Sequence, residues 1–577
     1  MPLSVWTSYL ASLGAGLNAA QWATLVVSAA AVVGTDVWLS VWSDARGGFS
    51  TGQYVGVYAA ITGGAALVLW ANALTWAVGG TRAARALHAR ALDTVLRAPT
   101  SFFDATPAGR IVNRFSGDVD TVDRALPGAF AGYVRLVAQI AATLVLEAVL
   151  LPWTLLGFAA TGALFVAIQR VYAASSRELK RLDAISKSPV FALLSESLAG
   201  VSTLRAYGAA PRFAAEFGAR LDANSRAFLG LNLLNRWLGL RLDWIGGVVV
   251  GFVCLAAVTT AGTISPGLVG LAISGAVSIT GLLNWALRSQ NDVEQHLASV
   301  QRVLAYAALA TEAPAHASSA APALPPGWPH AAALEVTGLT VRYRAHLPPA
   351  LRGVSFAVRP GEKVGIVGRT GSGKSTLMLA LFRILEAEAG SIAIDGVDVA
   401  TLGLHDLRSR LAVIPQDAQL FAGASVRDNV DPGGRAGDEQ VWAALARVQL
   451  ADVVRALGGD GGAGGLDARV QDGSFSAGQR QLLCFARALV RQPRLLVLDE
   501  ATASTDALTD GVLQRMLRGP DFAATTMLVI AHRVATVADA DRVLVLDAGA
   551  VVEYGPPSEL LADPASAFAQ LAARSTS

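Results

Sequence analysis

The sequence has little charge, little cysteine and no excess of basic residues. Only 16% of its 577 residues are Asp, Glu, Lys or Arg, whereas soluble domains average about 25%, and 53% are hydrophobic. This composition excludes an ordinary soluble enzyme. A net charge of +2 is too small to drive binding to nucleic acid, so no such partner is expected. The two cysteines, Cys254 and Cys484, lie far apart in segments of different character, which excludes a disulfide framework or a zinc site.

Four stretches contain almost no charged residue, and each is long enough to cross a membrane, for which about 20 apolar residues suffice. They are residues 1–35, 47–81, 129–169 and 244–287. The last two are each about twice as long as one span. The third is interrupted near Pro152, and the fourth is interrupted by the turn signal at residues 262–267. Because backbone groups must be hydrogen-bonded within lipid, the sequence predicts six helical spans.

Basic residues gather in two of the connections between these spans. Residues 82–124 contain seven Arg and residues 170–241 contain eleven Lys or Arg, whereas the opposite connections contain only Arg46 as a basic residue. Basic loops face the cytoplasm, so both long connections and both chain termini are expected there. The helical patterning of these connections predicts that the spans continue as helices into the cytoplasm.

The composition changes after about residue 301. Residues 311–332 are rich in Pro, Ala and Ser, which predicts a flexible linker. The remaining residues have the size of one soluble domain. The sequence therefore predicts a membrane domain with long cytoplasmic helices at residues 1–310, a linker at 311–332 and a cytoplasmic domain at 333–577.

A glycine-rich loop in the second domain follows the apolar segment EKVGIV. Its sequence GRTGSGKS, residues 368–375, matches the phosphate-binding pattern G-x-x-x-x-G-K-[ST]. Backbone N–H groups of such a loop surround phosphates at a helix N-terminus, Lys374 contacts the β and γ phosphates, and Ser375 offers its hydroxyl to Mg²⁺. A chance glycine-rich turn is the alternative, which a Lys at this position in so lysine-poor a chain disfavours. The ATP-binding residues expected here are Gly368, Arg369, Thr370, Gly371, Ser372, Gly373, Lys374, Ser375 and Thr376.

The segment LLVLDE, residues 495–500, is a continuous apolar strand that ends in two acids. A buried parallel strand of this kind delivers carboxylates to the carboxyl edge of its sheet. Asp499 is expected to hold Mg²⁺, and Glu500 is expected to orient and deprotonate the attacking water. A buried strand followed by an acidic helix cap is the alternative, and this motif alone does not decide between the two.

A third motif, FSAGQRQLLCFARALVRQPR, runs directly into that strand. With the three motifs in this order, the second domain resembles the nucleotide-binding domain of ATP-binding-cassette transporters, an α/β P-loop fold. The resemblance identifies residues 475–479 as the family's signature, in which Ser476, Gly478 and Gln479 contact ATP.

The same resemblance assigns four further residues. It implies that Tyr343 stacks on adenine, that Gln416 contacts Mg²⁺ and reports to the membrane domain, that Asp506 communicates between two ATP sites, and that His532 contacts the γ-phosphate. Taken singly, each has an ordinary structural explanation, such as a strand aromatic or a polar loop residue. The catalytic residues implied together are Lys374, Gln416, Glu500 and His532.

The membrane half narrows the resemblance. The segments WLSVWSD, SFFDATPAGRIVNRFSGDVDTVD, VYAASSRELKRLDAISKSPV, NRWL and LNWALR resemble the second membrane domain of the multidrug-resistance-associated (C) subfamily. The similarity extends from about residue 5 to about residue 561. It implies a six-span, type IV exporter-like helical domain followed by the second nucleotide-binding domain of such proteins. It also implies that residues 101–120 and 195–207 lie between the two domains.

The C subfamily exports organic anions, including glutathione and glucuronide conjugates. Four residues match positions that the family uses for conjugate binding, through guanidinium contacts and stacking. They are Arg236, Asn284, Trp285 and Arg288. Arg135 is a further candidate within a span, for which snorkelling to the cytoplasmic interface is an equal alternative. Glu147 is expected at the outer end of its span.

Two features depart from the family pattern. Phe475 and Ala477 replace the Leu and Gly of the general signature, which implies a weaker ATP site. In addition, members of the subfamily usually join two membrane domains and two nucleotide-binding domains, and this chain has one of each. Because one phosphate loop holds ATP from one side only, hydrolysis is expected to require a second half, either another copy or a first-half protein.

The sequence thus predicts an integral, multi-pass membrane protein of the plasma or vacuolar membrane that uses ATP and Mg²⁺ to export organic anions. A gated channel or channel regulator is the alternative within the subfamily, although neither a long phosphorylatable insert nor a degenerate acid after the apolar strand is present. Six spans argue against a soluble cassette ATPase of translation or repair. A truncated half, inactive without a partner, remains compatible with every motif.

Overall fold

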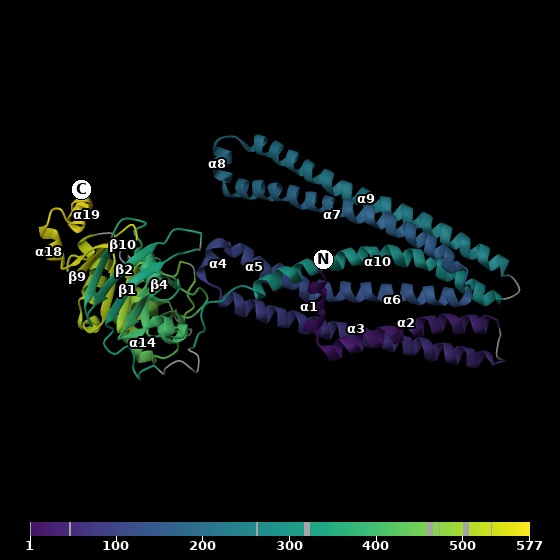
Figure 1. The fold of residues 1–577 in the computed structure, drawn as a ribbon, viewed down its shortest axis with the longest axis horizontal. Helices are drawn as coiled ribbons and strands as arrows, with labels where there is room; N and C mark the ends of the chain where they lie inside the picture. Colours follow the sequence, from purple (N-terminus) through teal and green to yellow (C-terminus); the bar gives the residue numbers. More distant parts are fainter. Residues whose placement is uncertain are drawn as a thin grey trace. The chain divides into compact units, whose positions relative to one another are not determined.

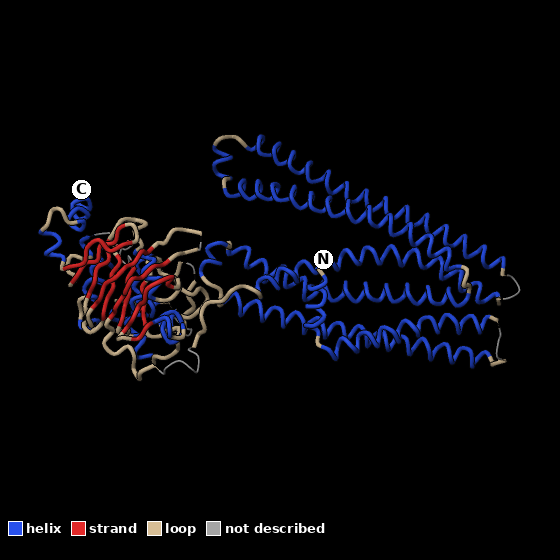
Figure 2. Tube along the Cα trace, in the orientation of Figure 1, coloured by secondary structure: helices blue, strands red, loops and turns tan. Residues whose placement is uncertain are grey.

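The computed structural model describes residues 2–44, 48–260, 264–316, 324–344, 346–457, 465–471, 473–499, 507–531 and 534–576. Within these residues the chain divides into two compact units. The helical unit comprises Met1–Leu96 and Ala108–Leu309, and the sheet unit comprises Arg97–Pro107 and Ala310–Ser577. Figure 1 shows the course of the chain, and the strands drawn in red in Figure 2 lie together in the sheet unit.

Six helical stretches of the described chain are long and apolar enough to cross a membrane, which confirms the six predicted spans. Each is much longer than the about 20 residues that a bilayer needs. The stretches are α2 (Ala15–Ser43), α3 (Thr51–Leu96), Ala108–Leu150, which comprises α5 (Ala108–Asn113), two π-helical turns (Arg114–Asp118 and Thr121–Ala125) and α6 (Leu126–Leu150), α7 (Thr154–Ala199), α9 (Ala210–Thr259) and α10 (Pro266–Ala307). The two predicted interruptions fall between α6 and α7 and between α9 and α10.

The first span begins later than the charge-free stretch suggests. A separate helix, α1 (Leu3–Leu13), precedes it and buries Val5, Tyr9 and Leu13. Gly14, whose φ is +93°, ends α1, and α2 starts at the next residue. A glycine adopts this left-handed backbone at little cost, so the chain turns here although its composition does not change.

Polar contacts connect the long helices of the helical unit. The Asn72 amide on α3 donates to the Gln21 carbonyl (3.1 Å) and to the Thr24 hydroxyl (2.8 Å), both on α2. The Asp118 carboxylate, which is buried, accepts hydrogen bonds from Arg114 and from Arg302 on α10. Buried polar groups of this kind are stable only when paired, so these contacts fix the helices in one register.

The described part of the sheet unit contains two sheets. The first is antiparallel, with the order β2-β1-β4-β5, and the second has the order β10-β9-β3-β8-β7-β6, with all neighbours parallel except β10 and β9. The strands are β1 (Leu334–Val341), β2 (Leu351–Val358), β3 (Lys363–Val367), β4 (Ala387–Ile394), β5 (Val397–Asp398), β6 (Leu411–Ile414), β7 (Leu495–Asp499), β8 (Thr526–Ile530), β9 (Arg542–Asp547) and β10 (Ala550–Gly555). The continuous apolar sequences of β7 and β8 fit strands buried on both faces.

Most helices of the sheet unit lie between these strands, two follow β10, and one short helix, α4, comes from the segment between α3 and α5. They are α4 (Thr100–Ala105), α11 (Lys374–Leu381), α12 (Leu404–Arg408), α13 (Val426–Val430), α14 (Asp438–Arg447), α15 (Ala451–Ala456), α16 (Ala477–Arg491), α17 (Ala507–Leu517), α18 (Pro557–Ala562) and α19 (Ala567–Thr576). In the helical unit, α8 (Val201–Ala206) joins α7 to α9 (Figure 1). The predicted order of a helical membrane part followed by an α/β domain is therefore confirmed.

The start of β1 is held by the turn between β4 and β5. The Asp395 carboxylate in this turn accepts hydrogen bonds from the backbone N–H groups of Ala331 (3.0 Å), Ala332 (3.1 Å) and Ala333 (2.8 Å). Partial burial raises the pKa of Asp395, but these N–H groups lower it further, so that it lies below its ordinary value. The charged carboxylate is therefore the form that the fold stabilises.

We expect Asp395→Asn to destabilise the sheet unit by about 1 to 2 kcal/mol at pH 7, since a charge-assisted set of hydrogen bonds is weakened. Asn tolerates the φ of +48° at this position, so the backbone is not strained. A carboxyl whose pKa is lowered by folding contributes stability above its unfolded pKa, near 4, and loses it as the pH falls through the folded value. Thermal unfolding of the full chain in detergent should therefore separate the two proteins at pH 7, and the difference should shrink as the pH falls below about 4. A constant difference would contradict this account.

Candidate functional site

The glycine-rich loop lies between β3 and α11 and closes tightly on its surroundings. Gly373 has a φ of +105°, and a Cβ there would lie 2.6 Å from Leu351 Cδ2. A Cβ on Gly368 would lie 2.2 Å from the Leu546 carbonyl oxygen. Both positions therefore require glycine, whereas Gly371, with a φ of +84°, has open space around it. The loop has the geometry of a backbone cradle at a helix N-terminus.

Lys374 is the first residue of α11, and its side chain folds back over the loop. It is buried, and its Nζ donates to the carbonyl oxygens of Gly368 (2.7 Å) and Arg369 (3.2 Å). Ser372 is buried as well, and its hydroxyl has no hydrogen-bond partner among the described residues. A buried cation and an unpaired donor beside a glycine-rich turn fit an anionic phosphate chain. The other loop residues that the sequence predicts to bind ATP, Arg369, Thr370, Gly371 and Ser375, are exposed, and Thr376 is buried.

The strand register brings the first acid of LLVLDE to the same sheet edge. Ile366 of β3 and Asp499 of β7 both pair with Ile530 of β8, which lies between them. Two strand spacings separate them by about 10 Å, and the loop starts two residues after Ile366. Asp499 is mostly buried at 8% exposure. Asp499 and the start of the loop thus lie at one edge of the sheet, and a carboxylate is a ligand type that Mg²⁺ prefers. The predicted residues Glu500, Asp506 and His532 lie outside the described residues.

Gln416 and the signature segment line a common pocket. Gln416 follows β6 by two residues and is exposed. It lines a pocket of about 320 Å³ together with Phe475 and Ala477. The buried Gln481 of α16 donates to the Pro415 carbonyl (3.1 Å) and so fixes α16 against this loop. Sequence reasoning missed Gln481, which directly follows the polar residues Gln479 and Arg480 and is not set apart from them by its position in the sequence.

Ser476 caps the N-terminus of α16. Its hydroxyl accepts a hydrogen bond from the Gln479 N–H (3.2 Å), and the Gln479 side chain accepts one from the Ser476 N–H (2.9 Å). This reciprocal pair satisfies two of the N–H groups that a helix start leaves open. Ser476 is exposed, whereas Gly478 and Gln479 are half-buried. The signature thus presents a rigid, capped helix start on the surface of the sheet unit.

Tyr343 lies beside α11. Its hydroxyl is 3.1 Å from the Thr376 hydroxyl, and its side chain is 38% exposed. The structure therefore brings Tyr343 close to the helix that starts at Lys374. Its predicted stacking on adenine stays a prediction.

The four residues predicted to bind substrate lie on two antiparallel helices of the helical unit. Gly246 of α9 packs against Thr280 of α10, since a Cβ on Gly246 would lie 2.2 Å from the Thr280 hydroxyl. Arg236 precedes Gly246 by ten residues, and Arg288 follows Thr280 by eight. Because α9 and α10 run in opposite directions, Arg236 and Arg288 lie at similar distances from this contact, on the same side of it along the helix axes. Arg236, Arg288 and Trp285 are exposed, and Asn284 is half-buried.

A cavity of about 840 Å³ lies between α2, α6 and α10 in the helical unit. Arg135 lines it, together with Gln139 and with Asp36, which sequence reasoning missed. The four predicted substrate residues are not among the described residues that line it. Glu147, near the end of α6, is buried beside this cavity, and its Oε1 lies 2.8 Å from the position of a Cβ on Gly275 in the cavity wall. Neither of its carboxylate oxygens has a hydrogen-bond partner among the described residues.

Comparison with known proteins places both parts of the chain. The ABC transporter transmembrane region family matches residues 19–283, and the ABC transporter family matches residues 351–503. ABC transporter C family member 3 of Dictyostelium discoideum is 42% identical over 92% of this chain and 38% of its own length. The human ATP-binding cassette sub-family C members 3 and 2 are 42% and 39% identical, each over 97% of this chain and 36% of their own length.

The chain thus spans a little over a third of the length of these relatives. The matches extend over the six spans and over the sheet unit with its glycine-rich loop. The order of the two matched regions is the order of the helical and sheet units. The chain therefore belongs to the ATP-binding-cassette transporter family, and its relatives place it in the C subfamily.

Proposed function

We propose that this chain is one half of an ATP-driven exporter of organic anions, including xenobiotics and their conjugates. The observation that carries the proposal is the position of the glycine-rich loop, Lys374 and Asp499 at one sheet edge, in a chain that also has six membrane spans. A phosphate cradle with an adjacent carboxylate is the arrangement that phosphoryl transfer needs. Because the same chain has six membrane spans, transport across the membrane is the process that ATP hydrolysis would drive.

In this proposal ATP binds with its phosphates in the loop and with Lys374 on the β and γ phosphates. Ser375, Gln416 and Asp499 hold Mg²⁺, which when bound neutralises the charge on the phosphates. Glu500 accepts a proton from the attacking water, and His532 contacts the γ-phosphate. Tyr343 supports the adenine ring, and Asp506 communicates with the second ATP site.

A second half completes each ATP site in this proposal. At the capped start of α16, Ser476 is exposed and Gly478 and Gln479 are half-buried, so this helix start is accessible to ATP held by another nucleotide-binding domain. Either another copy of this chain or a first-half protein supplies that domain. Closing the two domains around ATP drives the alternating access of the membrane cavity.

Positively charged residues in the helical unit suit an anionic cargo. Arg236 and Arg288 lie at a similar level on α9 and α10, with Trp285 and Asn284 next to Arg288. Guanidinium groups bind carboxylates with two hydrogen bonds, and an indole ring adds stacking. Arg135, in the wall of the cavity between α2, α6 and α10, adds a further cation. In this proposal the protein lies in the plasma or vacuolar membrane, with the sheet unit in the cytoplasm.

The test is the ATP hydrolysis of the purified chain in lipid nanodiscs, with and without a glutathione conjugate, and ATP-dependent uptake of that conjugate into inside-out vesicles. We expect the conjugate to stimulate hydrolysis, and Glu500→Gln to abolish the stimulation. Stimulated turnover by the chain alone supports a second copy as partner, whereas turnover only after a first-half protein is added supports a mixed pair. Absence of both stimulation and uptake in either arrangement contradicts the proposed export.

A further inference from the structure

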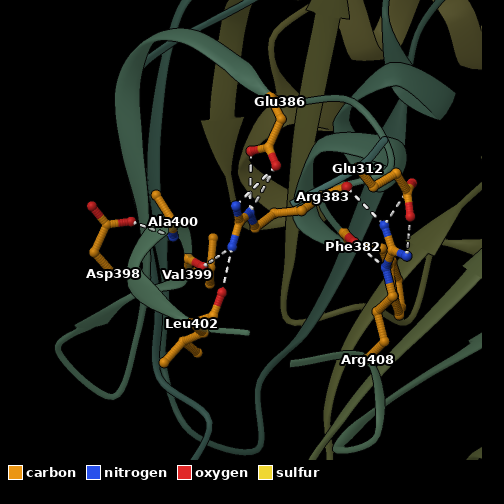
Figure 3. Close-up of polar contacts among 9 residues, drawn as sticks. All are labelled: Glu312, Phe382, Arg383, Glu386, Asp398, Val399, Ala400, Leu402 and Arg408. Carbon is orange, nitrogen blue, oxygen red and sulfur yellow. Dashed lines mark hydrogen bonds and ion pairs between the residues drawn. The ribbon is translucent and has the colours of Figure 1, made fainter. Parts of the chain in front are cut away.

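Arg408, the last residue of α12, contacts two separate parts of the chain (Figure 3). Its Nε donates to the Phe382 carbonyl (3.0 Å), and its NH2 group donates to the Arg383 carbonyl (2.8 Å). The same guanidinium donates to both carboxylate oxygens of Glu312, at 2.8 and 3.1 Å. A two-pronged contact of this type fixes both distance and orientation. Arg408 and Glu312 are 31% and 21% exposed, so the pair is largely sheltered from water.

The two carbonyls belong to the end of the helix that carries the phosphate loop. Phe382 and Arg383 directly follow α11, whose first residue is Lys374. Carbonyl groups at a helix C-terminus lack partners within the helix, and here Arg408 supplies them. Because α11 has only eight residues, about 12 Å of rigid helix joins the phosphate loop to Arg408.

Glu312 connects this helix end to the two places where the chain leaves long membrane helices. It lies five residues after the end of α10, and its backbone N–H donates to the Arg97 carbonyl (2.7 Å). Arg97 directly follows α3. The residues after Glu312 continue along α12, because the Leu404 N–H donates to the Pro314 carbonyl (3.0 Å) and the His405 N–H to the Ala315 carbonyl (2.7 Å).

Arg383 holds α12 in place from the other side. This side chain is buried, and it donates to the carbonyls of Val399 (3.0 Å) and Leu402 (2.6 Å), which precede α12, and to the Glu386 carboxylate (Figure 3). None of these contacts involves Glu312. The position of α12 against α11 is therefore set independently, and Glu312 attaches the chain segment from α10 to a fixed point.

We propose that Arg408 and Glu312 form a clamp that couples the phosphate-loop helix to the chain segments leaving α3 and α10. Both are positioning residues, since neither reaches the phosphate loop itself. When α11 shifts on ATP binding, Arg408 shifts with its end and carries Glu312 and the Arg97 carbonyl along. The role in transport rests on the proposed function, but the clamp itself has a readout that does not depend on transport.

The test is hydrogen exchange of the full chain in nanodiscs, read at the amides of Leu404, His405 and Glu312, with and without ATP. We expect Glu312→Gln to raise exchange at Leu404 and His405 about tenfold and to abolish the change that ATP causes there, because one charged hydrogen-bonding partner is lost. Glu312→Asp, which keeps the carboxylate, should restore part of the protection. The matched control is Asp452→Asn, which removes an exposed pair with Arg455 (2.7 Å) on α15 and should leave these amides unchanged.

Exchange in Glu312→Gln equal to that of the unaltered chain overturns the clamp, as does an ATP response that persists in this variant. With export established, Glu312→Gln should also lower the amount of conjugate transported per ATP hydrolysed about fivefold while nucleotide affinity stays the same. A ratio equal to that of the unaltered chain overturns the coupling role. Failure of the proposed export is recognised separately, because the unaltered chain then shows no conjugate-stimulated hydrolysis, while its exchange pattern still decides the clamp.

Discussion

Replacing Glu500 with glutamine is expected to lower ATP turnover about 10²- to 10³-fold and to leave ATP affinity within about twofold. Glutamine has the shape of glutamate and still orients a water molecule, but it accepts no proton from it. The prediction rests on β7, which brings Asp499 level with Ile366 of β3. Glu500 is the next residue in the sequence. The measurements are phosphate release under saturating ATP and binding of a fluorescent nucleotide.

The control for this variant is Glu439→Gln, in the first turn of α14, which removes a carboxylate from the same unit. It should hydrolyse ATP at the normal rate. Undiminished hydrolysis by Glu500→Gln would refute its assignment as the general base. A parallel loss of ATP binding would instead make Glu500 a binding residue.

Lys374→Ala is expected to reduce ATP affinity and turnover together, each by about 10²-fold or more. The Nζ group is buried and at present bonds to the Gly368 and Arg369 carbonyls, so its charge lies within the loop itself. Removing it leaves the phosphates without their closest cation and the two carbonyls without their donor. Nucleotide binding and phosphate release by the full chain in nanodiscs measure the effect.

The chain offers a close control in Lys363→Ala. Lys363 lies at the opposite end of β3, where its Nζ is 3.6 Å from an Asp539 carboxylate oxygen. The variant removes a lysine from the same strand and loop unit but leaves the phosphate edge intact. ATP binding should therefore stay normal. Equal losses in both variants would show that lysine removal damages the fold and would contradict a specific role for Lys374.

The spans and the loop were predictable because each depends on residues that are neighbours in the sequence. A stretch of about 20 apolar residues without charge is long enough to cross a bilayer, and this property can be read without knowing which helices lie nearby. The glycine pattern of residues 368–375 encodes a local turn, and the close contacts of Gly368 and Gly373 agree with it. Where the first span begins within residues 1–35 was not predicted, because a single residue, Gly14, ends α1 within an apolar stretch of uniform composition.

Contacts between distant residues were not predictable in the same way. The segment LHDLRSRL contains two Arg, and nothing in its spacing distinguishes Arg408, which pairs with Glu312, from its neighbour Arg410. Residues 311–332 were predicted to be a flexible linker from composition, yet Glu312, Pro314 and Ala315 make specific hydrogen bonds. Asp36 likewise gained its position in a cavity wall only through the packing of α2, α6 and α10. Such pairings are set by tertiary structure, which a single sequence does not reveal.

The short segment Arg97–Pro107 determines which pieces of sequence must be exchanged together in a chimera of two such proteins. It belongs to the sheet unit, although the residues on both sides of it belong to the helical unit. Neither unit is therefore one uninterrupted piece of gene. A chimera that takes only residues 310–577 from a relative would build the sheet unit from two different proteins, whereas one that also takes residues 97–107 would keep both of its segments from one protein. Exchanging the sheet unit between two transporters therefore means exchanging two separate segments of sequence.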